Sequence, residues 1–126
     1  MTKEQMKEVM IKVFQECMDL RDSGHDEYAH TTDAFANFNR LAERLGLDRK
    51  SIIMVYAEKH IDGIHAFVNG HKSQREDIEG RINDVIVYLC LLRGIIMEER
   101  HYANAVSDLD AALIPPHIAE EDDIPF

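Results

Sequence analysis

Residues 78–96 read IEGRINDVIVYLCLLRGII, and this stretch decides the fold class. Its apolar side chains recur three or four residues apart, which is the spacing of one face of an α-helix. Just upstream, Ser73 and Glu76 have the S-x-x-E spacing of a capping box, which satisfies free amide groups where a helix begins. The pattern therefore predicts a helix from this box to about Arg100. Its expected inward face comprises Ile78, Ile82, Val85, Leu89, Leu92 and Ile96.

Two glycines, Gly80 and Gly94, lie inside this predicted helix. Each costs about 1 kcal/mol relative to alanine, so a close helix contact or a bound ligand is expected to occupy the space at these positions, and close packing is the favoured reason.

Three segments nearer the N-terminus show the same helical spacing. The first predicted helix runs from about Thr2 to about Arg21, where the turn residues 22–24 follow. The second has Thr31 or Thr32 as its N-cap and ends at Gly46. The third is capped by Asp48 or Ser51 and ends at Asn69 and Gly70. Their expected inward faces are Met6, Met10, Val13, Phe14, Cys17 and Leu20; Phe35, Phe38, Leu41, Ala42 and Leu45; and Ile52, Ile53, Tyr56, His60, Ile64 and Phe67.

Strand signals are nearly absent, so the sequence predicts an all-α bundle of four main helices, with short connections that favour antiparallel neighbours. We expect a helical domain over residues 1–106, and an acidic tail over 107–126 that is extended beyond Pro115 and Pro116.

Charge and composition narrow the function classes. The 126 residues carry a net charge of -10, which opposes direct binding to nucleic acid. Six of the 24 acids and none of the 14 bases lie beyond Arg100, so the first hundred residues carry 18 acids and are only mildly acidic. No apolar run is long enough for a membrane helix or a signal peptide, which favours a cytoplasmic protein.

Cysteine and histidine give no sign of a zinc site. Cys17 and Cys90 lie in apolar helical patterns without metal or redox spacing, so we expect two buried free thiols. None of the seven histidines has zinc-site spacing, and each is expected at the surface or at its boundary, already partnered.

Polar residues of the third and fourth predicted helices can line one groove. Glu58 and Asp62 share a face, and carboxylates from facing helices can hold Mg²⁺ together with Asp84. Lys59 and Arg81 suit phosphate oxygens. The alternative is that these acids are solvated surface charges and that Arg81 and Asp84 form an intrahelical ion pair.

Part of the chain resembles a known family. Tyr28, AFANFNRLA at residues 34–42, Lys59 with His60, and EGRINDVIVYL at residues 79–89 resemble the phage nucleotide-modification-associated proteins. These are related to the all-α, MazG-like nucleoside triphosphate pyrophosphohydrolases. The resemblance extends over about residues 28–96 and is most specific from Arg81 to Tyr88.

The resemblance implies a helical homo-oligomer that binds a nucleotide beside Mg²⁺ and cleaves between its α and β phosphates. A phage protein of this kind would act in the cytoplasm of an infected or lysogenic bacterial host. The roles it implies are catalysis by Asp84, Arg81 and Lys59, nucleotide binding by Asn37, Lys59, Arg81 and Tyr88, and metal binding by Glu58, Asp62 and Asp84.

The chain also departs from the enzyme pattern of this family. It lacks a doubled glutamate E-E-x-x-E motif, and Arg81 stands three residues before Asp84, where the enzymes have an acid. Nucleotide binding without turnover, including nucleotide sequestration against a bacterial defence, is therefore an alternative.

A second resemblance lies in the tail. Asp122, Asp123, Ile124, Pro125 and Phe126 resemble the C-terminal tip of bacterial single-stranded-DNA-binding protein, which docks replication and repair proteins. Such a peptide can insert its aromatic ring into an apolar pocket while its acids face a basic rim. A protein that docks on those partners, or an inhibitor that competes for them, is expected from this resemblance. The alternatives are a solubilising tail and a tail folded back on its own helices.

Overall fold

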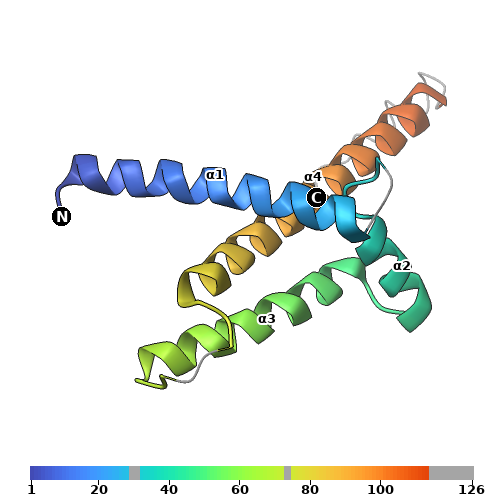
Figure 1. Cartoon of the computed structure of the whole chain (residues 1–126). Helices are drawn as coiled ribbons and strands as arrows, with labels where there is room; N and C mark the ends of the chain where they lie inside the picture. The colour runs from blue at the N-terminus through green and yellow to red at the C-terminus, as the bar shows by residue number, and fades with distance from the viewer. Residues whose placement is uncertain (29–31, 73–74, 114–126) are drawn as a thin grey trace, which may run out of the picture. The chain divides into compact units, whose positions relative to one another are not determined.

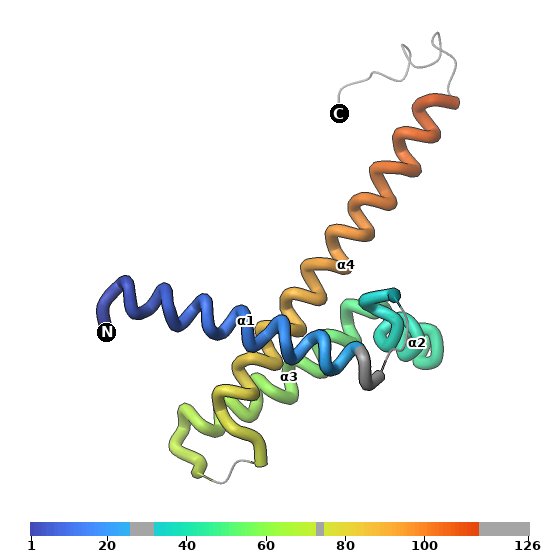
Figure 2. The backbone as a smooth tube through the Cα atoms, turned by 45° about the horizontal axis from the view of Figure 1, so that its top comes forward, coloured from blue at the N-terminus to red at the C-terminus, as the bar shows by residue number. Residues whose placement is uncertain are grey.

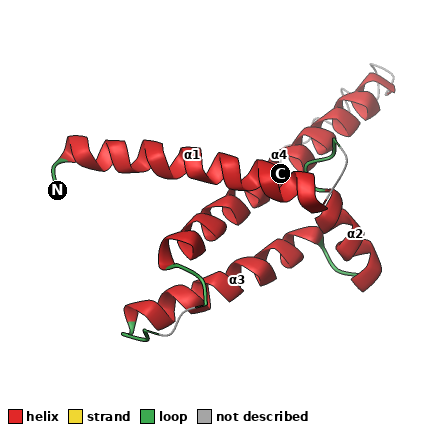
Figure 3. Ribbon diagram, viewed as in Figure 1, coloured by secondary structure: helices red, strands yellow, loops and turns green. Residues whose placement is uncertain are grey.

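The computed structural model describes residues 1–28, 32–72 and 75–113, and all four of its elements are helices (Figure 3). They are α1 (Lys3–Tyr28), α2 (Ala36–Leu45), α3 (Arg49–Val68) and α4 (Ile78–Leu113). The described part contains no strand, so the predicted all-α class with four main helices is confirmed. None of these helices combines the length and apolar character that a membrane crossing requires.

Helix α1 begins where local chemistry satisfies its first amide groups. The Thr2 hydroxyl accepts a hydrogen bond from the Gln5 amide at 3.1 Å, and the Gln5 side chain accepts one from the Thr2 amide at 2.8 Å. The helix then continues to Tyr28, so the predicted end near Arg21 is wrong. A single glycine, Gly24, does not stop it, since glycine weakens a helix interior by only about 1 kcal/mol.

The boundaries of α2 and α3 depend mainly on their caps. Gly46 ends α2 in the left-handed region at φ 66°, and the Asp48 carboxylate accepts a hydrogen bond from the Lys50 amide at 2.8 Å where α3 begins. Both predicted caps are confirmed, as is Asn69 at the end of α3. The N-cap of α2 is Phe35, so the prediction of Thr32 is wrong; Thr31 lies outside the described residues.

Helix α4 continues beyond the expected point at Arg100, as one helix as far as Leu113. Glu76 precedes the helix, and its expected capping partner Ser73 lies outside the described residues. The chain divides within α4 into two compact units, Met1–Arg93 and Gly94–Phe126. The expected boundary between the helical domain and the tail, at residues 106 and 107, stays a prediction.

Within the first unit, α3 and the beginning of α4 lie side by side and antiparallel (Figures 1 and 2). Ile53 and Ala57 of α3 are fully buried. Helix α1 reaches α4 through Asn83, which accepts a hydrogen bond from the Cys17 thiol at 3.7 Å and donates one to Glu16 at 3.0 Å. Burial raises the pKa of the Cys17 thiol. Cys17 is buried as expected, but Cys90 is exposed, so that half of the thiol prediction is wrong.

The inward face of α4 differs from the predicted one. Ile82 and Leu89, expected in the core, are 41% and 46% exposed, whereas Leu91 is buried. Counting back from Leu91 in steps of three and four reaches Tyr88, Asp84 and Arg81, so the polar stripe of this helix points inward. The predicted inward face of α4 is wrong because it was chosen from apolar residues alone, and polar side chains were expected to lie outside the interior.

The close helix approach expected at Gly80 is also wrong, because no neighbouring atom lies within 4 Å of the position that its Cβ would take. The approach occurs at Gly63 of α3, where an added Cβ would lie 2.6 Å from Cζ of Arg81. The same expectation for Gly94 stays a prediction.

Replacing Ile53 with alanine should lower the free energy of unfolding by about 2–5 kcal/mol, because the side chain is fully buried. The matched control is Ile11→Ala at a side chain that is 70% exposed, where we expect a change within about 0.5 kcal/mol. Urea unfolding followed by circular dichroism measures both. Equal losses in the two variants would contradict this description of the core.

Candidate functional site

An aromatic cluster joins α2, α3 and α4 in the first unit. Tyr56 and His60 stand four residues apart on one face of α3, and both lie against Tyr88 of α4. The rings of Tyr56 and Tyr88 stack with centroids 5.9 Å apart, and Phe38 of α2 meets Tyr56 edge-on at 6.3 Å. These contacts fix the position of His60 between two helices.

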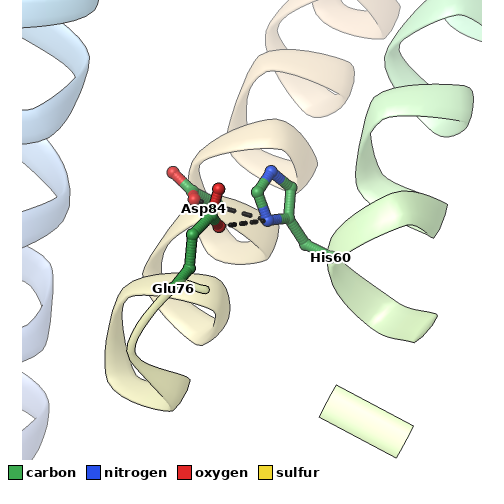
Figure 4. A group of neighbouring side chains, drawn as sticks. All are labelled: His60, Glu76 and Asp84. Carbon is green, nitrogen blue, oxygen red and sulfur yellow. Dashed lines mark ion pairs between the residues drawn. The ribbon is translucent and has the colours of Figure 1, made fainter. Parts of the chain in front are cut away.

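His60 is buried, with only 7% of its surface exposed, so the prediction of a partnered surface or boundary histidine is wrong for this residue. Its Nδ1 atom lies 3.4 Å from an Asp84 carboxylate oxygen and 3.5 Å from a Glu76 oxygen (Figure 4). Neither contact has the geometry of a hydrogen bond, and Nδ1 has no hydrogen-bond partner among the described residues. A buried polar atom in this condition is costly unless another ligand satisfies it.

The electrostatic surroundings of this cluster disfavour additional negative charge. Burial raises the pKa of Asp84 and the neighbouring His60 opposes this shift; the nearby Glu76 raises the pKa further, and the positive side chains of Arg81 and Lys59 lower it. Burial and the nearby Asp84 likewise raise the pKa of the Tyr88 hydroxyl. A cation placed between the two carboxylates would relieve their repulsion.

Arg81 lies at the edge of the cluster. Its Nη1 atom is 4.0 Å from Glu76, its side chain is largely buried, and its Nε has no hydrogen-bond partner among the described residues. The guanidinium occupies the space left by the missing side chain of Gly63. Glycine at this position therefore allows Arg81 to approach α3.

A pocket of about 530 Å³ opens beside the aromatic cluster. This volume is in the usual range for a small-molecule site. Four of the residues predicted to bind nucleotide or metal line it together: Asn37, Lys59, Asp84 and Tyr88. The other lining residues come from all four helices or their connections and include two more cations: Leu20, Arg21, Gly24, Ala34, Phe38, Arg40, Leu41, Tyr56, His60, Glu76 and Leu91.

The remaining predicted site residues do not join the pocket. Glu58 and Asp62 are exposed and lie outside the group of potential metal ligands around Asp84. Each is two residues from His60, so each points about 200° around α3 from the side chain that faces Asp84. The expected grouping of these two acids with Asp84 is therefore wrong.

Arg81 and the residues of the tail are the remaining parts of the predicted site. Arg81 does not line the pocket and lies against Gly63 and Glu76 instead. The tail residues Asp122, Asp123, Ile124, Pro125 and Phe126 lie outside the described residues.

Sequence reasoning gave no binding role to five members of the site: Arg21, Arg40, Tyr56, His60 and Glu76. Tyr56 was assigned only to the apolar face of its helix, and Glu76 was interpreted only as a capping residue. His60 was placed on the same apolar face and expected to be a partnered boundary histidine, not a ligand. A histidine inside an otherwise apolar helical face was the available signal, because a buried imidazole needs a polar partner.

The arrangement combines chemical functions that suit a phosphorylated, flat-ringed ligand. Tyrosine rings can stack on a base, Lys59 and the two pocket arginines can contact phosphate oxygens, and the carboxylates can hold a cation. The positive charge of Lys59 acts on the Asp84 carboxylate and opposes the rise of its pKa.

Comparisons with known proteins leave the site to be interpreted from its own chemistry. No family model, curated protein or solved structure shows a significant match to this chain.

Proposed function

We propose that this chain binds a nucleoside phosphate in the pocket that residues of all four helices line. The observation that carries the proposal is the convergence of Asn37, Lys59, Asp84 and Tyr88 on one pocket. These residues come from three helices and are far apart in the sequence. In the proposed complex the base stacks near Tyr88 and the phosphates lie toward Lys59, with Asn37 beside the base or sugar.

The pocket's charge distribution supports a phosphorylated ligand. Arg21, Arg40 and Lys59 face the pocket together with Glu76 and Asp84, so it offers both cations for phosphate and acids for a metal. Arg40 also donates a hydrogen bond to Asn37 at 3.2 Å, which orients the Asn37 amide. The proposed activity of the bound state is metal-dependent cleavage to a monophosphate and pyrophosphate, as in the MazG-like enzymes. Binding without turnover is the competing form of the proposal.

Lys59→Gln should weaken nucleotide binding about tenfold or more, because it removes a charged hydrogen bond to phosphate. Calorimetric titration with each nucleoside triphosphate in the presence of Mg²⁺ measures the affinity. Lys72→Gln is the matched control, since Lys72 is exposed and lies outside the pocket. Equal affinities in the two variants, or no binding by the parent protein, would contradict the proposed site.

The same mixtures test turnover. Release of monophosphate and pyrophosphate that is lost in Asp84→Asn supports the enzyme. Binding without product supports the sequestering alternative.

We also propose that the chain forms a homo-oligomer. Met6, Met10 and Phe14, expected on an inward face of α1, are 46–50% exposed in the single chain. Ile82 and Leu89 of α4 are exposed to a similar extent. Apolar faces of this size usually become covered by a partner, and a second copy of the chain carries the same surface.

Phe14→Glu should shift the protein toward the monomer, because it places a charge on the proposed contact face. Size-exclusion chromatography with light scattering over a range of concentrations measures the change. Gln15→Glu adds the same charge to the neighbouring exposed position and should leave the mass unchanged. A parent protein that is monomeric at all concentrations would exclude this assembly.

A second function is proposed for the tail, on its sequence alone. The acidic run that ends in Ile124, Pro125 and Phe126 matches the chemistry of a peptide that docks on a basic, apolar-centred pocket. The partners would be replication or repair proteins that recognise the tip of single-stranded-DNA-binding protein. In this form the chain acts as an adaptor or as a competitor for them.

Deleting residues 124–126 should abolish competition with a labelled tip peptide for a helicase or nuclease that binds this tip. The reason is that the aromatic anchor is lost while the acids that attract the partner remain. Fluorescence polarisation of the peptide gives the readout. Asp110→Asn controls for general acidity, since it changes charge outside the tip and should retain competition. Undiminished competition by the truncated protein would show that the tip is not the docking element.

A further inference from the structure

Three potential metal ligands converge in the first unit without bonding to one another. The Nδ1 atom of His60 and one carboxylate oxygen each of Glu76 and Asp84 all lie within 4.8 Å of one another. His60 comes from α3, Asp84 from α4, and Glu76 from the segment that precedes α4 (Figure 4). Among the described residues these three form the group of potential ligands at this spacing.

The imidazole is the independent sign of a ligand. The His60 side chain is 91% buried, since only 9% of its surface is exposed. Its Nδ1 atom points at the two carboxylates and has no hydrogen-bond partner in the part of the chain that the structure describes. An ordinary charge-assisted hydrogen bond would bring these atoms to about 2.7–2.9 Å. The separations of 3.4 Å and 3.5 Å are too long for that bond.

The two separations from Nδ1 match those between ligands of one cation, and the two carboxylate oxygens lie within 4.8 Å of each other. Ligand atoms about 2.1 Å from a tetrahedrally coordinated metal lie about 3.4 Å from each other. The two carboxylates balance the charge of a divalent ion, and a neutral imidazole supplies the third ligand. Three protein ligands leave one position open, as in sites where a metal meets water or a substrate oxygen.

We infer that His60, Glu76 and Asp84 form a binding site for a divalent transition metal of the Zn²⁺ type. Imidazole nitrogen favours such ions, whereas Mg²⁺ prefers oxygen ligands alone. Glu76 and Asp84 also line the proposed nucleotide pocket, so the open coordination position is close to where phosphate would lie. Only this last placement rests on the proposed function, because metal binding itself needs no nucleotide.

The experiment titrates Co²⁺, a spectroscopic substitute for Zn²⁺, into the full chain after treatment with a chelator and without nucleotide. Visible absorption of bound Co²⁺ should saturate at one ion per chain, Zn²⁺ should abolish the signal, and a large excess of Mg²⁺ should not. Absence of saturable binding would overturn the inference, and displacement by Mg²⁺ would overturn the assignment of metal type.

Variants locate the site. Asp84→Asn and His60→Gln should each weaken Co²⁺ binding by at least about tenfold, since each removes a ligand. Their matched controls, Asp62→Asn and His65→Gln, change the same residue types at exposed positions of α3 and should bind like the parent. Glu76→Gln also removes a ligand and should likewise weaken Co²⁺ binding. Glu76 is exposed and precedes α4, so this substitution should disturb folding less than the other two. Circular dichroism checks each fold, and equal binding by site and control variants would overturn the assignment.

This design separates the two proposals. If the protein binds Co²⁺ but no nucleotide, the metal site is supported and the nucleotide proposal is wrong. If it binds nucleotide but no Co²⁺, the nucleotide proposal is supported and the metal site is wrong.

Discussion

The contact of His60 with Asp84 and Glu76 is the constraint on which the pairing of α3 with α4 depends. An imidazole this deeply buried requires polar groups opposite it, and one of them, Asp84, occupies the face of α4 that a purely apolar pairing would have used. Tyr88 stacks on both Tyr56 and His60, so ring contacts accompany the polar contact between the two helices. The proposed pocket opens beside this arrangement, so the same residues that join the helices also form the candidate site.

The inward polar stripe of α4 has a consequence for its apolar residues. Since Arg81, Asp84 and Tyr88 face α3, Ile82 and Leu89 on the same helix are turned toward solvent. Met10 and Phe14 of α1 are also exposed. Few large side chains in the described part are fully buried, and Ile53 and Ile95 are the largest of them. A core this small provides limited hydrophobic stabilisation to one chain, which is the physical basis for proposing a homo-oligomer.

Sequence reasoning succeeded where structure is decided by neighbouring residues. Gly46 ends α2 and Asp48 begins α3, because a left-handed turn and a side-chain cap are local features. It failed at Gly24, where a weak stop signal did not interrupt α1. At the candidate site it identified Asn37, Lys59, Asp84 and Tyr88 but grouped Asp84 with the wrong acids. Helical spacing relates residues along one helix, and it does not say which face of a second helix they meet.

The sequence by itself determined the all-α class and the four main helices, since periodicity and caps act over a few residues. It also determined the acidity of the tail, which follows from composition alone. Only the tertiary structure decided that His60 and Glu76, separated by the end of α3 and the connection to α4, meet Asp84 in one cluster. It likewise decided that Gly63 makes room for Arg81. Both outcomes depend on the rotation of α3 and α4 about their axes, and this rotation is fixed by packing across the pair.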